Sequence, residues 1–196
     1  MAHIFPHWNW PERVGQVTPV HLYTSGDEAE LFLNGKSLGR KQKGPLEYRL
    51  RWDDVVYAPG ELRAVAYRDG KRWAEDVVRT TGPATRLLLA ADRTRIKADG
   101  QDLSFITVTI ADAAGQLVPR SRQLVWFEIE GPGEIVAVDN GDAASHESFQ
   151  ARQRRAFNGL CLAIVRGSPN QAGTVTVKAA SDDLSPAAIH LQTIAP

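Results

Sequence analysis

Apolar and polar residues alternate in short runs along most of the chain, and turn-forming residues separate the runs. Ala29, Leu31 and Leu33 occupy alternate positions of one run, and the dipeptide Asn34-Gly35 follows it. Because both residues of Asn-Gly tolerate the positive φ of a type I′ turn, this dipeptide predicts a β-hairpin. In the first half of the chain the pattern predicts strands over residues 16–24, 28–33, 36–40, 46–52, 61–67 and 72–80. No helix of ordinary length is expected there, so the first half is predicted to be a β-sandwich.

The alternation breaks at Thr81-Gly82-Pro83 and then restarts, with Ile106, Val108 and Ile110 on one face of a new strand. Further strands are expected over residues 123–130, 133–139, 155–165, 174–180 and 187–193. This spacing favours an immunoglobulin-like sandwich without the paired cysteines of antibody domains. The polar stretch 139–155 is expected to be a projecting loop. The predicted fold class is therefore all-β, with two consecutive β-sandwich domains over residues 1–82 and 83–196.

Composition and charge remove several classes of function. Of the 196 residues 43% are hydrophobic, and 23 basic side chains balance 23 acidic ones. Such a chain gives no support to binding of nucleic acid or an anionic membrane, since both depend on positive charge, and no apolar run approaches the ~20 residues of a membrane helix. The basic run from Arg152 to Arg155 is the local exception, and we interpret it as a solvated loop. Cys161 is the only cysteine, so no internal disulfide is expected and this thiol is predicted to be a small buried residue.

The chain starts with an irregular aromatic segment. Residues 1–15, MAHIFPHWNWPERVG, fit neither a signal peptide nor a presequence, and the chain begins as if cut from a longer one. Prolines at 6 and 11 exclude a continuous helix and disfavour a central strand. His7, Trp8 and Trp10 place three large rings close together, and we expect this segment to lie against another part of the protein.

Candidate catalytic and metal-binding groups are weak. The carboxylate pairs Glu28 with Glu30, Asp53 with Asp54 and Glu128 with Glu130 are interpreted as solvated strand faces. The loop Asp139, Asn140, Asp142 could turn oxygens towards a calcium ion, but it lacks the ligand count of an EF-hand, so a turn without metal is favoured. The five histidines lack metal-ligand spacing, and the nucleophile-elbow motif G-x-S-x-G does not occur. We therefore predict no cofactor and no metal, and the chain is a poor candidate for a self-standing enzyme.

Several long motifs resemble a known enzyme family. PHWNW at 6–10, GQVTPVHLYTSGDEAELFLNGKSLGR at 15–40 and YAPGELRAVAYRDGK at 57–71 are similar to the domain that follows the catalytic barrel in glycoside hydrolase family two, notably in its β-galactosidases. IKADGQDLSFITVTIADAAGQLVP at 96–119, VDNGD at 138–142 and FNGLCLAIVR at 157–166 are similar to the next domain of these enzymes. The resemblance covers nearly the whole chain.

The resemblance implies a fragment without the catalytic part. Family-two enzymes resemble one another in carrying two catalytic glutamates on a (β/α)₈ barrel and in hydrolysing β-galactosides or related β-glycosides with retention. A barrel needs about 250 residues with alternating strands and helices, and no glutamate here matches the family's catalytic motifs. The expected partner is the catalytic barrel of the same parent polypeptide, which the resemblance suggests is a periplasmic or secreted bacterial protein.

Three functions then compete. The first is an accessory structural module, with His7, Trp8, Asn9 and Trp10 at the junction with the barrel and with His7 or Trp10 reaching towards the active site. The second is a carbohydrate-binding module that holds a β-galactoside or polysaccharide on exposed tryptophans; its candidates are Trp8, Trp10, Trp52, Trp73 and, in the second domain, Trp126. The third is an immunoglobulin-like adhesion or spacer domain, since the 98–119 run is also similar to repeats of bacterial surface adhesins.

Overall fold

A computed structural model describes residues 1–195 and shows a protein built almost entirely of strands. The chain separates into two compact units, Met1–Thr80 and Thr81–Pro196, each of which is described by itself. The single helical turn among the described residues is the 3-10 element η1, Pro11–Arg13. Within residues 1–195 no helix reaches the length and apolarity of a membrane span. The predicted all-β class is confirmed.

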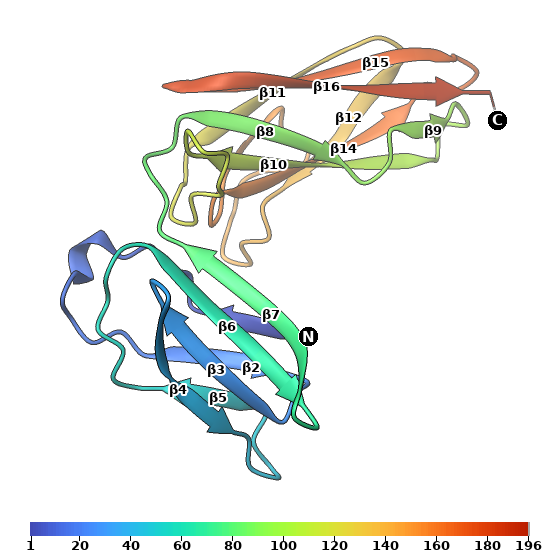
Figure 1. The fold of residues 1–196 in the computed structure, drawn as a ribbon. Coiled ribbons are helices and arrows are strands. Elements are labelled where there is room, and N and C mark those ends of the chain that lie inside the picture. The colour runs from blue at the N-terminus through green and yellow to red at the C-terminus, as the bar shows by residue number, and fades with distance from the viewer. Residues whose placement is uncertain (196) are drawn as a thin grey trace. The chain divides into compact units, whose positions relative to one another are not determined.

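The first unit is a sandwich of two antiparallel sheets (Figure 1). The three-stranded sheet has the order β1 (Ala2–Phe5), β2 (Val20–Thr24), β5 (Arg49–Trp52). The four-stranded sheet has the order β4 (Lys36–Gln42), β3 (Glu28–Leu33), β6 (Glu61–Arg68), β7 (Lys71–Arg79). The predicted hairpin is confirmed: Leu33 pairs with Lys36, and Asn34 and Gly35 have φ of 50° and 81°.

One predicted strand of this unit begins later than the sequence suggested. The run 46–52 alternates throughout, but β5 starts only at Arg49, which is the residue that pairs with Tyr23 of β2. Leu46 and Tyr48 are 96% and 68% exposed. The prediction of a strand over 46–52 is therefore wrong for residues 46–48, because they precede the segment that is paired with β2.

The core of the first unit lies between its sheets. Alternate residues of the strands point into it, as the period of two predicts. Each strand contributes its inward side chains, and the largest fully buried ones are Ile4, Trp8, Leu22, Leu31, Trp52, Tyr57 and Leu62. At roughly 1.5 to 3 kcal/mol for each large apolar side chain taken out of water, this cluster supplies most of the favourable free energy of the unit. Because Ile4, Leu22 and Leu50 point into this core, their neighbours on β1, β2 and β5 point outward.

The second unit is an immunoglobulin-like sandwich of two ladders. Its strands are β8 (Arg86–Ala91), β9 (Arg95–Lys97), β10 (Leu103–Ala111), β11 (Leu124–Glu130), β12 (Gly133–Asp139), β13 (Gln153–Arg155), β14 (Leu160–Gly167), β15 (Gly173–Ser181) and β16 (Leu184–Ile194). One ladder runs β12-β14-β10-β8 and the other β16-β15-β11-β13, with a parallel bridge between β8 and β16 and with β9 parallel to β16. The prediction of a second β-sandwich is confirmed.

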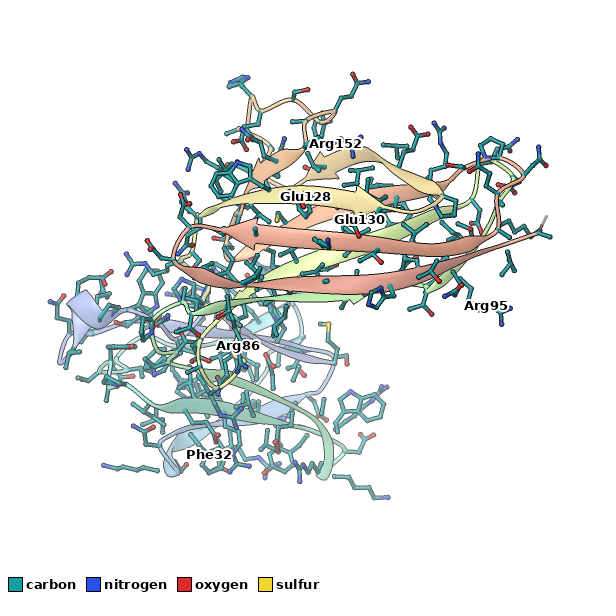
Figure 2. The ribbon with its side chains drawn as sticks, turned by 90° about the horizontal axis from the view of Figure 1, so that it is seen from above. Phe32, Arg86, Arg95, Glu128, Glu130 and Arg152 are labelled. Atoms are coloured by element: carbon teal, nitrogen blue, oxygen red, sulfur yellow. The ribbon has the colours of Figure 1, made fainter. Side chains whose placement is uncertain are left out.

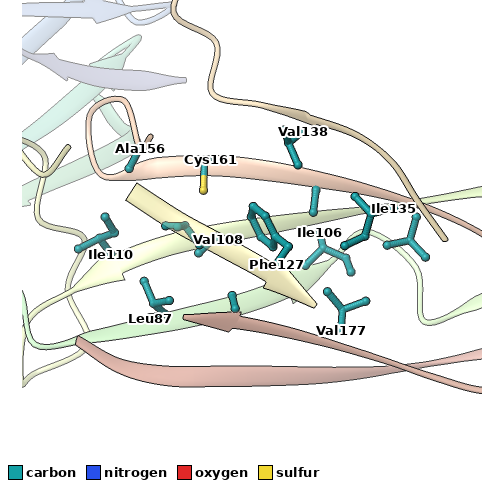
Figure 3. Close-up of a cluster of buried hydrophobic side chains, with 14 of the residues drawn as sticks. Leu87, Ile106, Val108, Ile110, Phe127, Ile135, Val138, Ala156, Cys161 and Val177 are labelled. Atoms are coloured by element: carbon teal, nitrogen blue, oxygen red, sulfur yellow. The ribbon is translucent and has the colours of Figure 1, made fainter. Parts of the chain in front are cut away.

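Alternate residues of these strands fill a single apolar core. Figure 3 shows Ile106, Val108 and Ile110 of β10 pointing to the same interior as Phe127. Cys161 lies in this core at 3% exposure, as predicted. Burial raises the pKa of its thiol to about 12, so this sulfur is an unreactive packing group.

The polar stretch 139–155 departs from the expectation of a solvated loop. Its last three residues form β13, which pairs with β11, and Arg154 is 0% exposed. The Arg154 guanidinium donates to Glu147 O at 2.9 Å and to Asn140 Oδ1 at 3.2 Å. The interpretation of the basic run as solvated is therefore wrong for Arg154, whose partners lie 7 and 14 residues earlier in the chain.

Candidate functional site: the amino-terminal aromatic segment

Trp8 anchors the aromatic segment to the first unit. Its side chain is 0% exposed, and its indole Nε1 donates to Ala58 O at 2.9 Å. Its ring packs on Tyr57 with a centroid separation of 4.8 Å and a tilt of 54°. A buried indole with a satisfied N–H and a tilted aromatic neighbour is a stable packing unit, so the segment is fixed at its centre.

His7 and Trp10, which flank Trp8 in the sequence, stack their rings on each other. Their ring centroids are 4.3 Å apart with an interplanar angle of 18°, and the Trp10 Nε1 donates to His7 O at 2.8 Å. Both side chains are partly exposed, whereas Asn9 is buried at 8%. The two rings therefore form a rigid plate that is accessible at the surface of the unit.

A chain of hydrogen bonds beneath the plate joins it to the end of the first unit. The Trp10 backbone N–H donates to the Tyr57 hydroxyl at 3.1 Å, and the Thr80 hydroxyl donates to Trp8 O at 2.7 Å. The two hydroxyls are 3.1 Å apart, and this order of donors makes the Tyr57 hydroxyl the donor to Thr80. Consecutive donors and acceptors polarise one another, so these contacts hold the segment as one network. Tyr57 opens the motif at 57–71, but its contact with Thr80 joins residues 23 positions apart, so no local pattern indicated the roles of these two hydroxyls.

Three exposed valines lie at the end of η1, on the segment that follows it, and on the later segment that pairs with it. Val17 forms an isolated antiparallel bridge with Val56, and the two side chains are 50% and 49% exposed. Val14, at the C-terminal end of η1, is 57% exposed. We call Val14, Val17 and Val56 the valine patch. A hollow of about 300 Å³ adjoins it, lined by Leu33, Lys36, Leu38, Asp54, Val55 and Val56.

The other tryptophans differ in how far their side chains are exposed. Trp52 is buried at 1%, Trp73 of β7 is 50% exposed with its Nε1 on Ser25 Oγ at 3.0 Å, and Trp126 of β11 is partly buried. Trp8 and Trp52 thus present no ring face to a sugar. Contacts of His7, Asn9, Trp10 or Trp126 with a barrel or a carbohydrate stay predictions.

The loop considered for calcium is held by donors of the protein itself. Asp139 Oδ1 accepts the backbone N–H of Asn140 at 2.7 Å, and Asn140 Oδ1 accepts that of Asp142 at 3.0 Å. Asp142 Oδ1 in turn accepts the backbone N–H of Ala144 at 3.0 Å. In the part of the chain that the structure describes, no three His, Cys, Asp or Glu side chains gather in a group suited to a metal ion. These oxygens shape the turn.

The paired carboxylates of the strands lie in ion pairs and hydrogen bonds. Glu28 pairs with Arg40, Glu30 accepts from Ser37 at 2.6 Å, and Glu130 pairs with Lys178 at 2.5 Å. Figure 2 shows Glu128 and Glu130 along the same strand, β11. The hydrogen bond that the Lys178 ammonium donates to Glu130 raises the pKa of Lys178. Exposed pairs of this kind stabilise by about 1 kcal/mol or less, and they indicate a solvated surface.

Fold and site together define a tandem β-sandwich module with an anchored aromatic plate on its first unit. The model of the glycoside hydrolase family 2 C-terminal domain 5 matches residues 87–190, and the model of a domain family of unknown function matches residues 15–74. The chain belongs to the C-terminal domain family of the glycoside hydrolase family 2 enzymes. The resemblance seen in the sequence is thereby confirmed.

Relatives and solved structures agree with this assignment. A β-galactosidase of Bacteroides ovatus is 38% identical over 192 residues, which are 97% of this chain and 22% of that protein. The structure of a glycosyl hydrolase family 2 member from Bacteroides cellulosilyticus matches with a TM-score of 0.89 and 37% identity, covering 96% of this chain and 24% of the other. A β-glycosidase from Bacteroides vulgatus gives a TM-score of 0.92 at 28% identity, covering 98% and 24%. The chain spans about a fifth of the length of the curated relatives it matches.

Proposed function

We propose that this chain is a non-catalytic accessory module of a retaining β-glycosidase, similar to the β-galactosidases, and that it packs on and supports the catalytic barrel of the same polypeptide. In this function the aromatic segment is the junction with the barrel. The plate of His7 and Trp10 and the valine patch are the surfaces that the barrel covers.

The observation that carries the proposal is the combination of rigidity and exposure at the aromatic segment. Trp8 is fully buried and hydrogen bonded, while the flanking rings of His7 and Trp10 remain partly exposed. A surface that is fixed before contact loses little conformational entropy on docking. The three valines, each about half exposed, add apolar area of the kind that marks interaction surfaces.

The carboxylates support a non-catalytic role. A retaining glycosidase needs a general acid of raised pKa near a second carboxylate about 5 Å away. Here backbone N–H groups lower the pKa of Asp27, Asp99 and Asp112. Groups held in this way are structural acceptors, and they are unsuited to donate a proton at neutral pH. The activity of the parent is inferred from the Bacteroides ovatus relative, which is a β-galactosidase.

The test separates the module from the rest of the parent. The 196-residue chain and the preceding part of the parent polypeptide are expressed apart and mixed, and their association is measured by analytical ultracentrifugation. We expect a complex in which the preceding part unfolds at a higher temperature and hydrolyses an aryl β-galactoside, whereas this chain alone has no activity.

Paired variants locate the contact. Val17→Asp with Val56→Asp places charge in the valine patch, and we expect affinity for the preceding part to fall by about a hundredfold, since two buried unpaired charges cost several kcal/mol. Leu160→Asp, at a residue 37% exposed in the second unit, is the matched control and leaves the affinity unchanged. Association that is insensitive to the valine variants would contradict the proposed surface, and activity of this chain alone would contradict the non-catalytic role.

A further inference from the structure

The outward face of the sheet β1-β2-β5 carries rings and guanidinium groups in two rows. The register places His3 opposite Tyr23 and Tyr23 opposite Arg49. In the second row Phe5 lies opposite His21, and His21 lies opposite Arg51. All six side chains point away from the core, because the residues between them, Ile4, Leu22 and Leu50, are buried. We call these six residues together with Tyr48 the ring-and-arginine face.

The aromatic members of this face are accessible. Phe5 is 54% exposed and Tyr48 is 68% exposed. The ring of Tyr48 stacks beside that of Tyr23, with centroids 6.2 Å apart and an interplanar angle of 27°. Since strands of a sheet lie about 4.8 Å apart, neighbouring rings on this face are spaced on the scale of one sugar ring. The face is thus a broad aromatic surface. It was not predicted from the sequence, because the candidates considered there were tryptophans and this face contains none.

The charge of the face is positive and incompletely neutralised. Arg51 pairs with Asp53 at 2.8 Å, but among residues 1–195 Arg49 has no carboxylate within ion-pair distance. Arg49 is instead oriented by neutral groups: a hydrogen bond with Tyr23 raises its pKa, and its Nη1 lies 3.5 Å from His21 Nδ1. Burial, together with Arg49 and Arg51, lowers the pKa of His21. The imidazole is therefore neutral at pH 7. Because the groups that contact Arg49 are neutral, its positive charge is not balanced by a carboxylate of the residues that the structure describes.

A hollow lies at the edge of the face beside Arg49. Its volume is about 220 Å³, and Leu46, Glu47, Tyr48, Arg49 and Arg51 line it. The hollow joins an exposed phenol ring to two guanidinium groups and to the Glu47 carboxylate, which accepts the backbone N–H of Gly44 at 2.8 Å. A guanidinium is planar and matches a carboxylate through two parallel N–H···O bonds. The apolar C–H face of a pyranose ring packs on an aromatic ring, while its hydroxyls stay hydrated.

We propose that the ring-and-arginine face binds an acidic saccharide, with a uronate carboxylate on Arg49 and Arg51 and with sugar rings on Tyr48, Tyr23 and Phe5. A planar carboxylate can accept two parallel N–H···O bonds from the fork of a guanidinium. This function goes beyond support of the barrel, and it uses residues that are distinct from the aromatic plate and the valine patch. It gives the module a means to hold a charged glycan.

The test compares two oligosaccharides that differ in their carboxylates. The 196-residue chain is titrated with trigalacturonate and with α-1,4-galactotriose, and binding is followed by calorimetry and by the amide NMR signals of β1, β2 and β5. We expect trigalacturonate to bind at least about tenfold more tightly than the neutral trimer, because hydrogen bonds to a charged carboxylate are stronger than those to a neutral hydroxyl. We also expect the affinity to fall as salt is raised.

Matched variants assign the site. Arg49→Gln and Tyr48→Ala are each expected to weaken trigalacturonate binding by about tenfold or more. Arg68→Gln and Trp73→Ala change a second arginine and aromatic ring, which lie 5.1 Å apart on β6 and β7, and they should leave binding unchanged. Unperturbed amide spectra of all four variants confirm that the fold is intact.

Three results would overturn the proposal. Equal affinity for the two trimers would remove the role of the arginines, and absence of binding to either would remove the site. Protection of β1 and β5 amides from hydrogen exchange in the longer parent, relative to this chain alone, would show that protein covers the face. Each of these results leaves the docking test of the valine patch unaffected, so the two proposals fail separately.

Discussion

Arg154 offers the sharpest test of how the second unit is held together. Its guanidinium lies 3.5 Å from Asp139 and 3.7 Å from Glu147, and it lies over the ring of Phe149 at 5.1 Å. It therefore joins β13 to Asp139, at the start of the polar stretch, and to Glu147 and Phe149 further along it. Replacing it by methionine keeps most of the side-chain volume but removes every polar contact.

The magnitude follows from the partners left behind. Glu147 O loses the donor that Arg154 supplies, and Asn140 Oδ1 keeps only the backbone N–H of Asp142. The carboxylates of Asp139 and Glu147 lose a buried cation. These side chains are 43% and 33% exposed, so water compensates part of the loss. Breaking a fully buried pair costs 3 to 5 kcal/mol, and we therefore expect Arg154→Met to lower the free energy of unfolding by about 3 kcal/mol. For a unit of this size that is a fall of about 10 °C in the unfolding temperature.

The assay uses thermal and urea unfolding of the chain, with hydrogen exchange of residues 139–155 to assign the effect. Arg152→Met is the matched control, because Arg152 is two residues away and exposed (Figure 2). We expect the control to change the free energy of unfolding by less than about 0.5 kcal/mol. If Arg154→Met and Arg152→Met gave the same small change, the guanidinium would not organise this stretch, and the reasoning would be refuted.

Three further predictions concern single residues. The carboxylate of Asp112 accepts backbone N–H groups of Gly82, Ala114 and Gln116, each at 2.9 Å, and the bonds from Gln116 and Gly82 lower its pKa below 3.8. The ionised carboxylate therefore stabilises the folded state above pH 4, and this stabilisation is lost as pH falls through the lower pKa of the folded state. In Asp112→Asn the unfolding temperature should fall less steeply with acid than in the unchanged chain. An identical dependence of the unfolding temperature on pH would refute this. Trp8→Phe leaves Ala58 O without its donor and opens a small cavity, and it should cost about 2 kcal/mol in urea unfolding, whereas Trp73→Phe should cost almost nothing. With its pKa at about 12, the Cys161 thiol should not react with Ellman's reagent at pH 8 until denaturant unfolds the chain, and fast labelling of the native protein would contradict its burial.

The strand pattern and the family were accessible from the sequence because both depend on local order. A period of two fixes which residues of a strand share a face, and Asn34-Gly35 fixes the hairpin by its tolerance of positive φ. The burial of Ile106, Val108 and Ile110 follows from the same rule. The long ordered motifs of residues 6–71 and 96–166 carried the family resemblance, since they require only the order of residues along the chain.

The exposure of individual rings was not accessible in this way. Trp8 and Trp73 both follow polar or turn residues in the sequence, but one is 0% and the other 50% exposed. The difference arises because Trp8 meets Ala58 and Tyr57, which lie about 50 residues later. The exposure of Phe5 and Tyr48, 54% and 68%, is set by the fold of the first unit in the same way.

The sequence by itself determined the all-β class, the turns and the family, because alternation, turn chemistry and motif order are properties of neighbouring residues. Only the tertiary structure decided that Arg154 is buried and that His3, Tyr23 and Arg49 lie in one row. Burial of a charge requires acceptors from other segments of the chain, and the row across the sheet requires the register of β2 with β5, which are not consecutive strands. Both are set by packing of the whole unit, which no local pattern encodes.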